Sequence, residues 1–178
     1  MKTIQILDKK FSISIPASEI QLKIEELAEQ LNSELHEKAV VFVVILNGAF
    51  MFASDLYKLV TLDSRISFLK LASYSGTSSS GQVKQLIGLN ESLKDKTVVI
   101  LEDIIDTGVT LDSILKQLKG FEPAEIKIAT LLHKPDAYTF KHKIDYIGFS
   151  IPNDFIVGYG LDYDGFGRNL DSIYTVID

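Results

Sequence analysis

The sequence predicts an α/β fold in which a central parallel sheet is flanked by helices. Apolar runs of strand length alternate along the chain with amphipathic stretches of helix length, and this rhythm is typical of βα units with right-handed crossovers. Two of the runs, Ala39–Leu46 and Thr97–Leu101, are almost wholly apolar and rich in β-branched residues. Such runs favour strands that are buried on both faces of a parallel sheet. Ligands of these sheets bind beyond the carboxyl ends of the strands.

The first predicted element is a helix over Ala17–Lys38. Ser18 is its expected N-cap. Apolar residues at helical spacing draw one stripe along it, namely Ile20, Ile24, Leu27, Leu31 and Leu35. The strand Ala39–Leu46 follows, and the turn Asn47–Gly48 ends it.

The later elements continue the alternation. A helix over Thr110–Gly120 follows the strand Thr97–Leu101, and Gly120 is expected at its C′ position. The other predicted elements are a helix over Ala49–Val60 and strands over Ile66–Ser73, Glu125–His133 and Ile144–Ser150.

Two segments do not fit this rhythm. Ser73–Lys84 is dominated by Ser and Gly. Because it falls inside a compact domain, we expect a lid over a binding site, with a plain linker as the alternative. Ile151–Asp178 is rich in Gly, Asp and aromatic residues and has no helical period.

The composition fits one soluble domain over residues 1–178, since 46 % of the residues are hydrophobic and 24 % are charged. The formal charge of −6 disfavours nucleic acid as a partner. The chain has no cysteine for disulfides or thiolate metal sites, and its histidines share no ligand spacing. No stretch has the roughly 18–20 apolar residues that span a membrane. We therefore expect no membrane partner and a cytoplasmic location.

The stretch Val98–Ser113 combines a strand end, a turn and a helix start. A helix that begins near Thr110 directs free N–H groups and a partial positive charge at its N-terminus. Gly108 allows the backbone to approach a ligand closely, and Thr107 adds a hydroxyl donor. This arrangement can hold a phosphate without a lysine. The stretch contains neither the dinucleotide fingerprint nor the Walker A pattern.

Acidic residues in the same stretch indicate a sugar beside the phosphate. Glu102 and Asp103 end the strand, and Asp106 lies in the turn. Carboxylates accept hydrogen bonds from vicinal ribose hydroxyls, with or without a divalent cation. A bound ribose 5-phosphate would place its anomeric carbon near Asp106. The alternative is that these acids are capping and surface residues, which is the preferred interpretation for Asp112.

The stretch VVILEDIIDTGVTL resembles the phosphoribosyl-diphosphate-binding motif of type I phosphoribosyltransferases, in the EDIIDTG form of the hypoxanthine-guanine branch. The resemblance covers nearly the whole chain. It extends to the pyrophosphate loop, the flexible catalytic loop, and the purine-binding and C-terminal segments, which are VILNGAFMFASDL, LASYSGTSSSGQVK, LLHKPD and YIGFSIPNDFIVGYGLDYDGFGRNL. It implies the type I phosphoribosyltransferase fold, with a core at about 37–150 and a small hood formed by about 1–36 with 151–178. It also implies Mg²⁺ as cofactor and a homodimer or homotetramer.

The resemblance implies a role for each matched residue. Asp106 would be the catalytic acid–base residue, and the 5′-phosphate would bind at Asp106, Thr107, Gly108, Val109 and Thr110. Glu102 and Asp103 would bind the ribose and, with Asp162, the magnesium ion. The purine would contact Lys134, Phe155, Ile156 and Asp162. Pyrophosphate would contact Asn47, Gly48 and Arg168. The lid loop would begin at Ser73 and Tyr74.

One position departs from the family pattern. Members often have Lys-Gly where this chain has Asn47–Gly48. The loss of that charge bears on affinity for the diphosphate or on communication between subunits. The family often has a cis peptide at this turn.

The implied reaction is purine salvage. The 5-phosphoribosyl group moves from phosphoribosyl diphosphate to a 6-oxopurine, hypoxanthine or guanine, giving IMP or GMP plus pyrophosphate. Lys134 would donate to the 6-oxygen and repel a 6-amino group. Two alternatives stay open, a xanthine-preferring phosphoribosyltransferase and a nucleotide-sensing, RNA-binding regulatory protein on the same fold.

Overall fold

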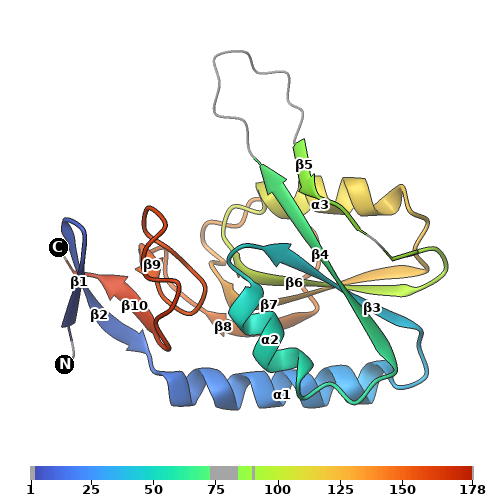
Figure 1. The fold of residues 1–178 in the computed structure, drawn as a ribbon, viewed down its shortest axis with the longest axis horizontal. Coiled ribbons are helices and arrows are strands. Elements are labelled where there is room, and N and C mark those ends of the chain that lie inside the picture. Colours follow the sequence, from blue (N-terminus) through green and yellow to red (C-terminus); the bar gives the residue numbers. More distant parts are fainter. Residues whose placement is uncertain (1–2, 73–83, 90, 178) are drawn as a thin grey trace.

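The structure is a computed structural model that describes residues 3–72, 84–89 and 91–177. These residues form a six-stranded sheet with helices on both faces and a separate four-stranded sheet at one end (Figure 1). The predicted α/β fold with a central parallel sheet is therefore confirmed. No helix among the described residues is both long and apolar enough to cross a membrane.

The main sheet has the strand order β5-β4-β3-β6-β7-β8. Its strands are parallel except for the edge strand β5, which is antiparallel to β4. Their bounds are β3 (Val40–Leu46), β4 (Ser64–Ala72), β5 (Lys84–Ile87), β6 (Thr97–Ile105), β7 (Glu125–His133) and β8 (Tyr146–Ser150).

The register of the main sheet brings the strand ends to one edge. Ile105 at the end of β6 is paired with His133 at the end of β7, and His133 is paired with Ser150 at the end of β8. The turns that follow these strands therefore meet at the carboxyl edge, where ligands of such sheets bind.

Helices cover both faces of the main sheet (Figure 1). The helices α1 (Ala17–Leu35) and α2 (Phe50–Tyr57) lie on one face, and α3 (Val109–Lys119) lies on the other. The apolar stripe predicted for α1 is buried against the first face. Leu111, Ile114 and Leu118 of α3 are buried against the second face. Burial of about 1.5–3 kcal/mol per large apolar side chain holds these layers together.

Both predicted helix caps are wrong, and the helices predicted to end at Lys38 and Val60 end at Leu35 and Tyr57. Ser18 is not an N-cap, because α1 begins at Ala17 with Pro16 as the N-cap residue. The N–H of Ala17 instead donates to Ser172 Oγ at 3.1 Å, so a distant segment provides the acceptor. Gly120 follows α3 with φ −65°, in the right-handed region. It is therefore a continuation of the helical turn and not a left-handed C′ glycine.

The second sheet has the order β1-β2-β10-β9 and joins both ends of the chain (Figure 1). Its strands are β1 (Thr3–Ile6), β2 (Lys9–Ile15), β9 (Ile156–Val157) and β10 (Ile173–Val176). Phe11, Val157 and Tyr174 form its small core. The expected hood of about 1–36 included the first helix, but α1 packs on the main sheet. We use "hood" below for residues 3–15 and 151–177.

Candidate active site

The turn that the sequence predicts to bind phosphate lies between β6 and α3. Gly108 has φ +89°, and a Cβ at this position would lie 2.5 Å from the Tyr138 ring. Only glycine fits both the backbone conformation and the space. The helix begins at Val109, and its N-cap residue Gly108 offers no side-chain cap. The Val109 N–H makes only a long contact of 3.5 Å with Thr107 Oγ1, so the first amides can turn to an anion.

The turn encloses a cavity of about 180 Å³. Asp106, Thr107, Gly108 and Thr110 line it together with Glu102 from the strand. Two of the three predicted carboxylates, Glu102 and Asp106, therefore share one small hollow with the predicted phosphate donors.

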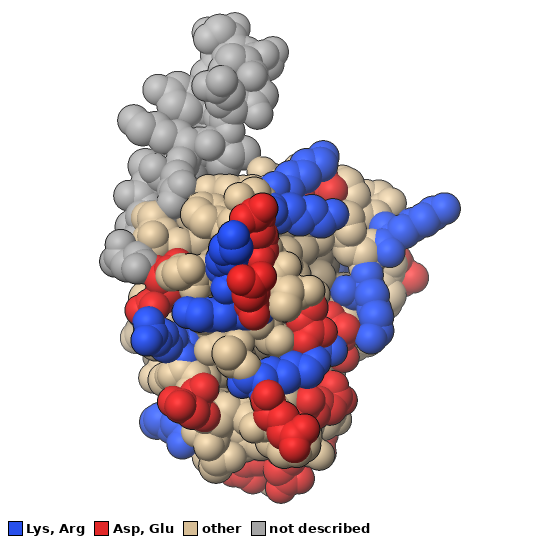
Figure 2. Space-filling view, turned by 90° about the vertical axis from the view of Figure 1, so that its right-hand side faces the viewer, with Lys and Arg blue, Asp and Glu red and all other residues tan. Residues whose placement is uncertain are grey.

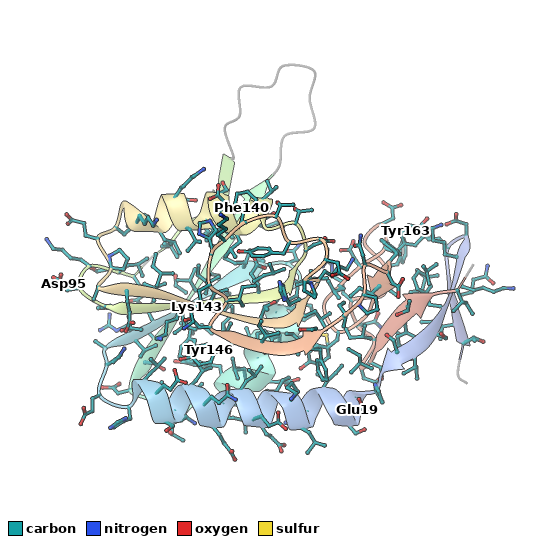
Figure 3. The ribbon with its side chains drawn as sticks, turned by 180° about the vertical axis from the view of Figure 1, so that it is seen from behind. Glu19, Asp95, Phe140, Lys143, Tyr146 and Tyr163 are labelled. Carbon is teal, nitrogen blue, oxygen red and sulfur yellow. The ribbon has the colours of Figure 1, made fainter. Side chains whose placement is uncertain are left out.

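A segment after β7 braces the turn from behind. The backbone N–H and the hydroxyl of Thr139 both donate to the carbonyl oxygen of Thr107, at 3.2 and 3.1 Å. The Tyr138 hydroxyl donates to the carbonyl of His142 at 3.0 Å, and His142 Nε2 lies 2.9 Å from Asp112 Oδ1. Phe140, from the same segment, lies beside α3 (Figure 3). Asp112, interpreted from sequence as a helix-end residue, thus also ties this segment to α3.

Glu102 and Asp103 are called the acidic pair below. The carboxylate of Asp103 lies under the turn that follows β3. A Cβ on Gly48 would lie 1.7 Å from Asp103 Oδ2, so the backbone of Gly48 rests directly on the carboxylate. The Leu46–Asn47 peptide is cis, as the family resemblance allowed. The side chain of Asn47 is exposed. The predicted pyrophosphate turn and one predicted ribose ligand are therefore in contact.

Burial dominates the electrostatics of this pair. Glu102 is buried, and burial together with the neighbouring Asp103 carboxylate raises its pKa well above the usual range. Burial raises the pKa of Asp103 to about 6, although hydrogen bonds from backbone N–H groups and the charge of Arg168 act to lower it. Two acids held in this way are poised to accept hydrogen bonds or a cation that compensates their charge.

Asp106 and Lys134 meet at the carboxyl edge. Lys134 Nζ lies 3.2 Å from Asp106 Oδ2, and the lysine is buried, with 7 % of its surface exposed. The N–H of Lys134 donates to the carbonyl of Ile105 at 3.0 Å, which fixes the lysine beside the end of β6. A buried ammonium beside a half-exposed carboxylate is a donor and acceptor set suited to a polar heterocycle.

Next to this pair, His133 has a buried Nε2 with no hydrogen-bond partner among the described residues. Its ring packs edge-to-face on Tyr138, with centroids 5.4 Å apart. Burial lowers the pKa of His133.

The hood contributes a loop that lies against the pyrophosphate turn. Arg168 donates to the carbonyl of Gly160 at 2.7 Å and lies 2.5 Å from Asp162 Oδ1. The other carboxylate oxygen of Asp162 accepts from the N–H of Gly165 at 2.7 Å. A Cβ on Gly160 would lie 2.0 Å from the carbonyl oxygen of Gly48. The two predicted ligands Asp162 and Arg168 are therefore partners of each other in this loop.

Phe155 lies at the hood side of the site. Its ring is 44 % exposed and packs edge-on against Tyr163, with centroids 5.5 Å apart; Tyr163 is in the hood (Figure 3). Ile156 is buried in β9 and paired with Thr175. The segment that leads to Phe155 and Ile156 leaves the main sheet beside His133, whose carbonyl oxygen accepts the N–H of Ile151 at 2.8 Å. An exposed aromatic face here is available for stacking on a planar ligand.

The structure thus places most predicted site residues along one edge and one hood loop. Ser73 and Tyr74, the predicted opening of the lid, lie outside the described residues. Sequence reasoning missed Thr139, which braces the phosphate turn, and Gly160, which the pyrophosphate turn requires. The glycine in VGYGLD was a visible signal for the second, whereas nothing in the sequence pointed to the first.

This fold, with a phosphate turn, an acidic pair and a covering hood loop, defines the class of phosphoribosyltransferases. Residues 16–164 match the model of the phosphoribosyl transferase domain. The chain is 40 % identical to the hypoxanthine phosphoribosyltransferase of Escherichia coli K12, over 93 % of this chain and 94 % of the relative. It is 38 % identical to the hypoxanthine-guanine phosphoribosyltransferase of Mycobacterium tuberculosis H37Rv, over 93 % and 85 %.

A solved structure agrees with these relatives. The crystal structure of a hypoxanthine phosphoribosyltransferase from Staphylococcus aureus matches with a TM-score of 0.87 and 39 % identity, covering 93 % of this chain and 91 % of that one. The chain belongs to the hypoxanthine and hypoxanthine-guanine phosphoribosyltransferase family, so it is a pentosyltransferase, as the sequence predicted.

Proposed function

We propose that this protein transfers the 5-phosphoribosyl group of phosphoribosyl diphosphate to a 6-oxopurine, hypoxanthine or guanine, and releases pyrophosphate. The whole chain would act as one phosphoribosyltransferase domain in purine salvage. The observation that carries the proposal is the cavity that the turn shares with Glu102 and Asp106, together with the contact of Lys134 with Asp106. The family relationship makes the same assignment for the reaction class.

In this proposal the phosphate and the ribose of phosphoribosyl diphosphate bind to different residues of the site. The 5′-phosphate lies on the amides and hydroxyls from Asp106 to Thr110, with Gly108 and Val109 offering backbone N–H groups. The ribose hydroxyls lie on Glu102 and Asp103. The purine nitrogen attacks C1′ while pyrophosphate leaves, and positive charge builds on the sugar. Carboxylates fixed in a site with little water stabilise that charge where it develops.

Lys134 and Asp106 would handle the purine. The ammonium donates to the 6-oxygen, and the carboxylate assists proton movement at the imidazole nitrogen N7. Phe155 stacks on the base, while Ile156 and Asp162 flank its position 2. The 6-amino group of adenine and the Lys134 ammonium are both hydrogen-bond donors, so this contact selects against adenine.

Arg168, Asn47 and Gly48 would hold the leaving pyrophosphate. The contact between Gly160 and Gly48 keeps the hood loop over that turn. Ser73 and Tyr74 would be the first residues of the loop that excludes water, the competing nucleophile.

We propose Mg²⁺ as the cofactor. No group of three or more acidic or histidine ligands occurs within the described residues. Mg²⁺ commonly binds one or two carboxylates and completes its shell with water and substrate phosphate, and the pair of buried Glu102 and partly buried Asp103 fits that donor set. Asp162 is engaged by Arg168 and Gly165, so it would contact the ion through water or after releasing Arg168. The bound ion would neutralise charge on the diphosphate.

A homodimer or homotetramer and a cytoplasmic location are further parts of the proposal. Sedimentation of the purified protein tests the first, and cell fractionation tests the second.

The decisive assay measures pyrophosphate release with phosphoribosyl diphosphate and Mg²⁺, comparing hypoxanthine, guanine, xanthine and adenine in parallel. We expect turnover with hypoxanthine and guanine and none with adenine. A preference for xanthine would establish the first alternative. Absence of turnover with every base would refute the proposal.

RNA binding tests the regulatory alternative. The end of the molecule away from the hood carries mixed Lys, Arg, Asp and Glu side chains without a continuous basic field (Figure 2). Measured nucleotide synthesis together with no RNA binding at low salt would exclude that alternative.

A further inference from the structure

A buried tyrosine joins the hood loop to the main domain. The Tyr159 hydroxyl donates to Asp55 Oδ2 at 2.5 Å, and only 5 % of Tyr159 is exposed. Burial and the hydrogen bond to the carboxylate raise the pKa of Tyr159 far above its usual value. Burial acts to raise the pKa of Asp55, but hydrogen bonds from Lys58 and Tyr159 outweigh it and lower the pKa. The bond therefore joins a neutral phenol to a charged carboxylate, which is a strong class of hydrogen bond.

The two residues connect the segments that carry the pyrophosphate contacts of the proposed function. Asp55 lies in α2, which begins at Phe50 immediately after the turn of Asn47 and Gly48. Tyr159 lies in the hood loop that continues to Asp162 and Arg168.

The backbone around Tyr159 shows that the loop is closely constrained. Tyr159 has φ +48°, between Gly158 at +106° and Gly160 at +98°. A non-glycine residue in this region is uncommon and persists where its surroundings hold it. The N–H of Tyr159 donates to the carbonyl of Leu170 at 2.9 Å, and its hydroxyl makes the bond to α2.

The same loop closes a stack of backbone contacts over the acidic pair. Gly160 lies against the carbonyl of Gly48, and Gly48 lies against the carboxylate of Asp103, each closer than a Cβ would permit. Arg168 donates to the carbonyl of Gly160 at 2.7 Å. Any displacement of the loop from α2 would therefore move the guanidinium and the pyrophosphate turn apart.

We propose that Tyr159 and Asp55 are positioning residues for the diphosphate half of the reaction. Their hydrogen bond fixes the hood loop on α2 and thereby holds Arg168 and the turn at Gly48 in register around the leaving group. Neither residue needs to touch the substrate. The inference rests on the proposed function and adds the pair that aligns its pyrophosphate contacts.

Tyr146 provides a matched control. It is also a buried tyrosine, and its hydroxyl donates to Glu34 Oε2 at 2.7 Å. It joins β8 to α1, and it lies farther along the main domain from the hood than the hood loop does (Figure 3). Tyr159→Phe and Tyr146→Phe therefore each remove one phenol–carboxylate bond and leave the ring in place.

The experiment measures kcat, the KM for phosphoribosyl diphosphate, the KM for hypoxanthine, and thermal unfolding for both variants. Binding of phosphoribosyl diphosphate with Mg²⁺ is measured by calorimetry in parallel. We expect Tyr159→Phe to lower kcat/KM for phosphoribosyl diphosphate about tenfold and to weaken its binding, with a smaller change in the KM for hypoxanthine. Tyr146→Phe should lower the unfolding temperature without either kinetic change.

Variants of Asp55 test the same bond from the other side. Asp55→Asn keeps an oxygen that accepts the hydrogen bond of Tyr159. Its kcat/KM for phosphoribosyl diphosphate should therefore fall less than that of Asp55→Leu. Lys58→Met removes the ion pair at Asp55, whose atoms are 2.7 Å apart, and leaves the Tyr159 bond; it should behave as wild type. If Tyr159→Phe does not fold, the ordering of these variants still decides the question.

Two failures can be told apart. If the wild-type protein turns over no purine, the proposed function is refuted. If the wild type is active but Tyr159→Phe and Tyr146→Phe have the same kinetic parameters, or Asp55→Leu equals Asp55→Asn, the pair has only a structural role and the positioning proposal is overturned.

Discussion

Gly48→Ala tests how tightly the pyrophosphate turn and the acidic pair are packed. The added Cβ would lie 1.7 Å from Asp103 Oδ2 and 2.4 Å from its Cγ, where ordinary van der Waals contact begins at 3.4 Å. Gly48 is not among the described residues with a positive φ, so the cost comes from overlap and not from backbone conformation. The carbonyl of Gly48 already lies against Gly160, which prevents the turn from moving away from the carboxylate.

The magnitude follows from this overlap. Overpacking of a filled interior costs roughly 1–3 kcal/mol, which for a domain of this size lowers the unfolding temperature by roughly 2–12 °C. A displacement of about 1 Å at a reacting site can cost on the order of 10² in rate. We therefore expect kcat/KM for phosphoribosyl diphosphate to fall about 10²-fold.

The assay combines pyrophosphate release with thermal unfolding, and Gly120→Ala is the matched control. Gly120 has φ −65° at the end of α3, and its added Cβ would meet only the carbonyl of Gln117, at 3.3 Å. We expect near-normal activity and stability for that variant. In an Asp103→Ala background the Gly48→Ala change should cost little stability, because the overlapping carboxylate is gone. Equal destabilisation in both backgrounds, or activity equal to that of Gly120→Ala, would refute the reasoning.

Three further predictions concern the purine side of the site. Asp106→Asn should keep binding of phosphoribosyl diphosphate in calorimetry but lower kcat by about 10²–10⁴, and an Asn variant with near-normal kcat would exclude the acid–base role. Lys134→Gln should raise the KM for hypoxanthine at least about tenfold, the effect of roughly 1.4 kcal/mol, and reduce the preference for hypoxanthine over adenine; an unchanged preference would contradict the contact with the 6-oxygen. Burial lowers the pKa of His133 from 6.5, so the unfolded chain takes up this proton first and stability is lost as the pH falls below 6.5. The unfolding temperature of His133→Leu should therefore fall less than that of wild type between pH 7 and pH 5. If the unfolding temperatures of the two proteins fall in parallel, His133 does not contribute.

The main sheet was predictable because its signals are local. Continuous β-branched runs marked β3 and the first part of β6, and an apolar stripe marked α1. The end of β6 was predicted at Leu101, but the strand continues to Ile105. Glu102 and Ile104 are paired there with residues of β7, so the neighbouring strand and not the polar local sequence extends the element. Tertiary pairing overrode the composition.

The hood strands had no such local signal. β2 pairs with β10, which joins Phe11 to Val176 across nearly the full length of the chain. The strands are short, and each is completed by a partner distant in sequence. Periodicity within one segment cannot report a pairing of this kind.

The site divides in the same way. The acids and the phosphate donors fall within one stretch of sequence, so their combination could be interpreted before the fold was known. The contacts that align them are made by glycines between distant segments: Gly108 against Tyr138, Gly48 against Asp103, and Gly160 against Gly48. A glycine in a sequence shows that the backbone needs space, but it does not show which segment fills that space. The residue types therefore predict the kind of ligand, whereas the geometry of the proposed site arises only when three chain segments close on one another.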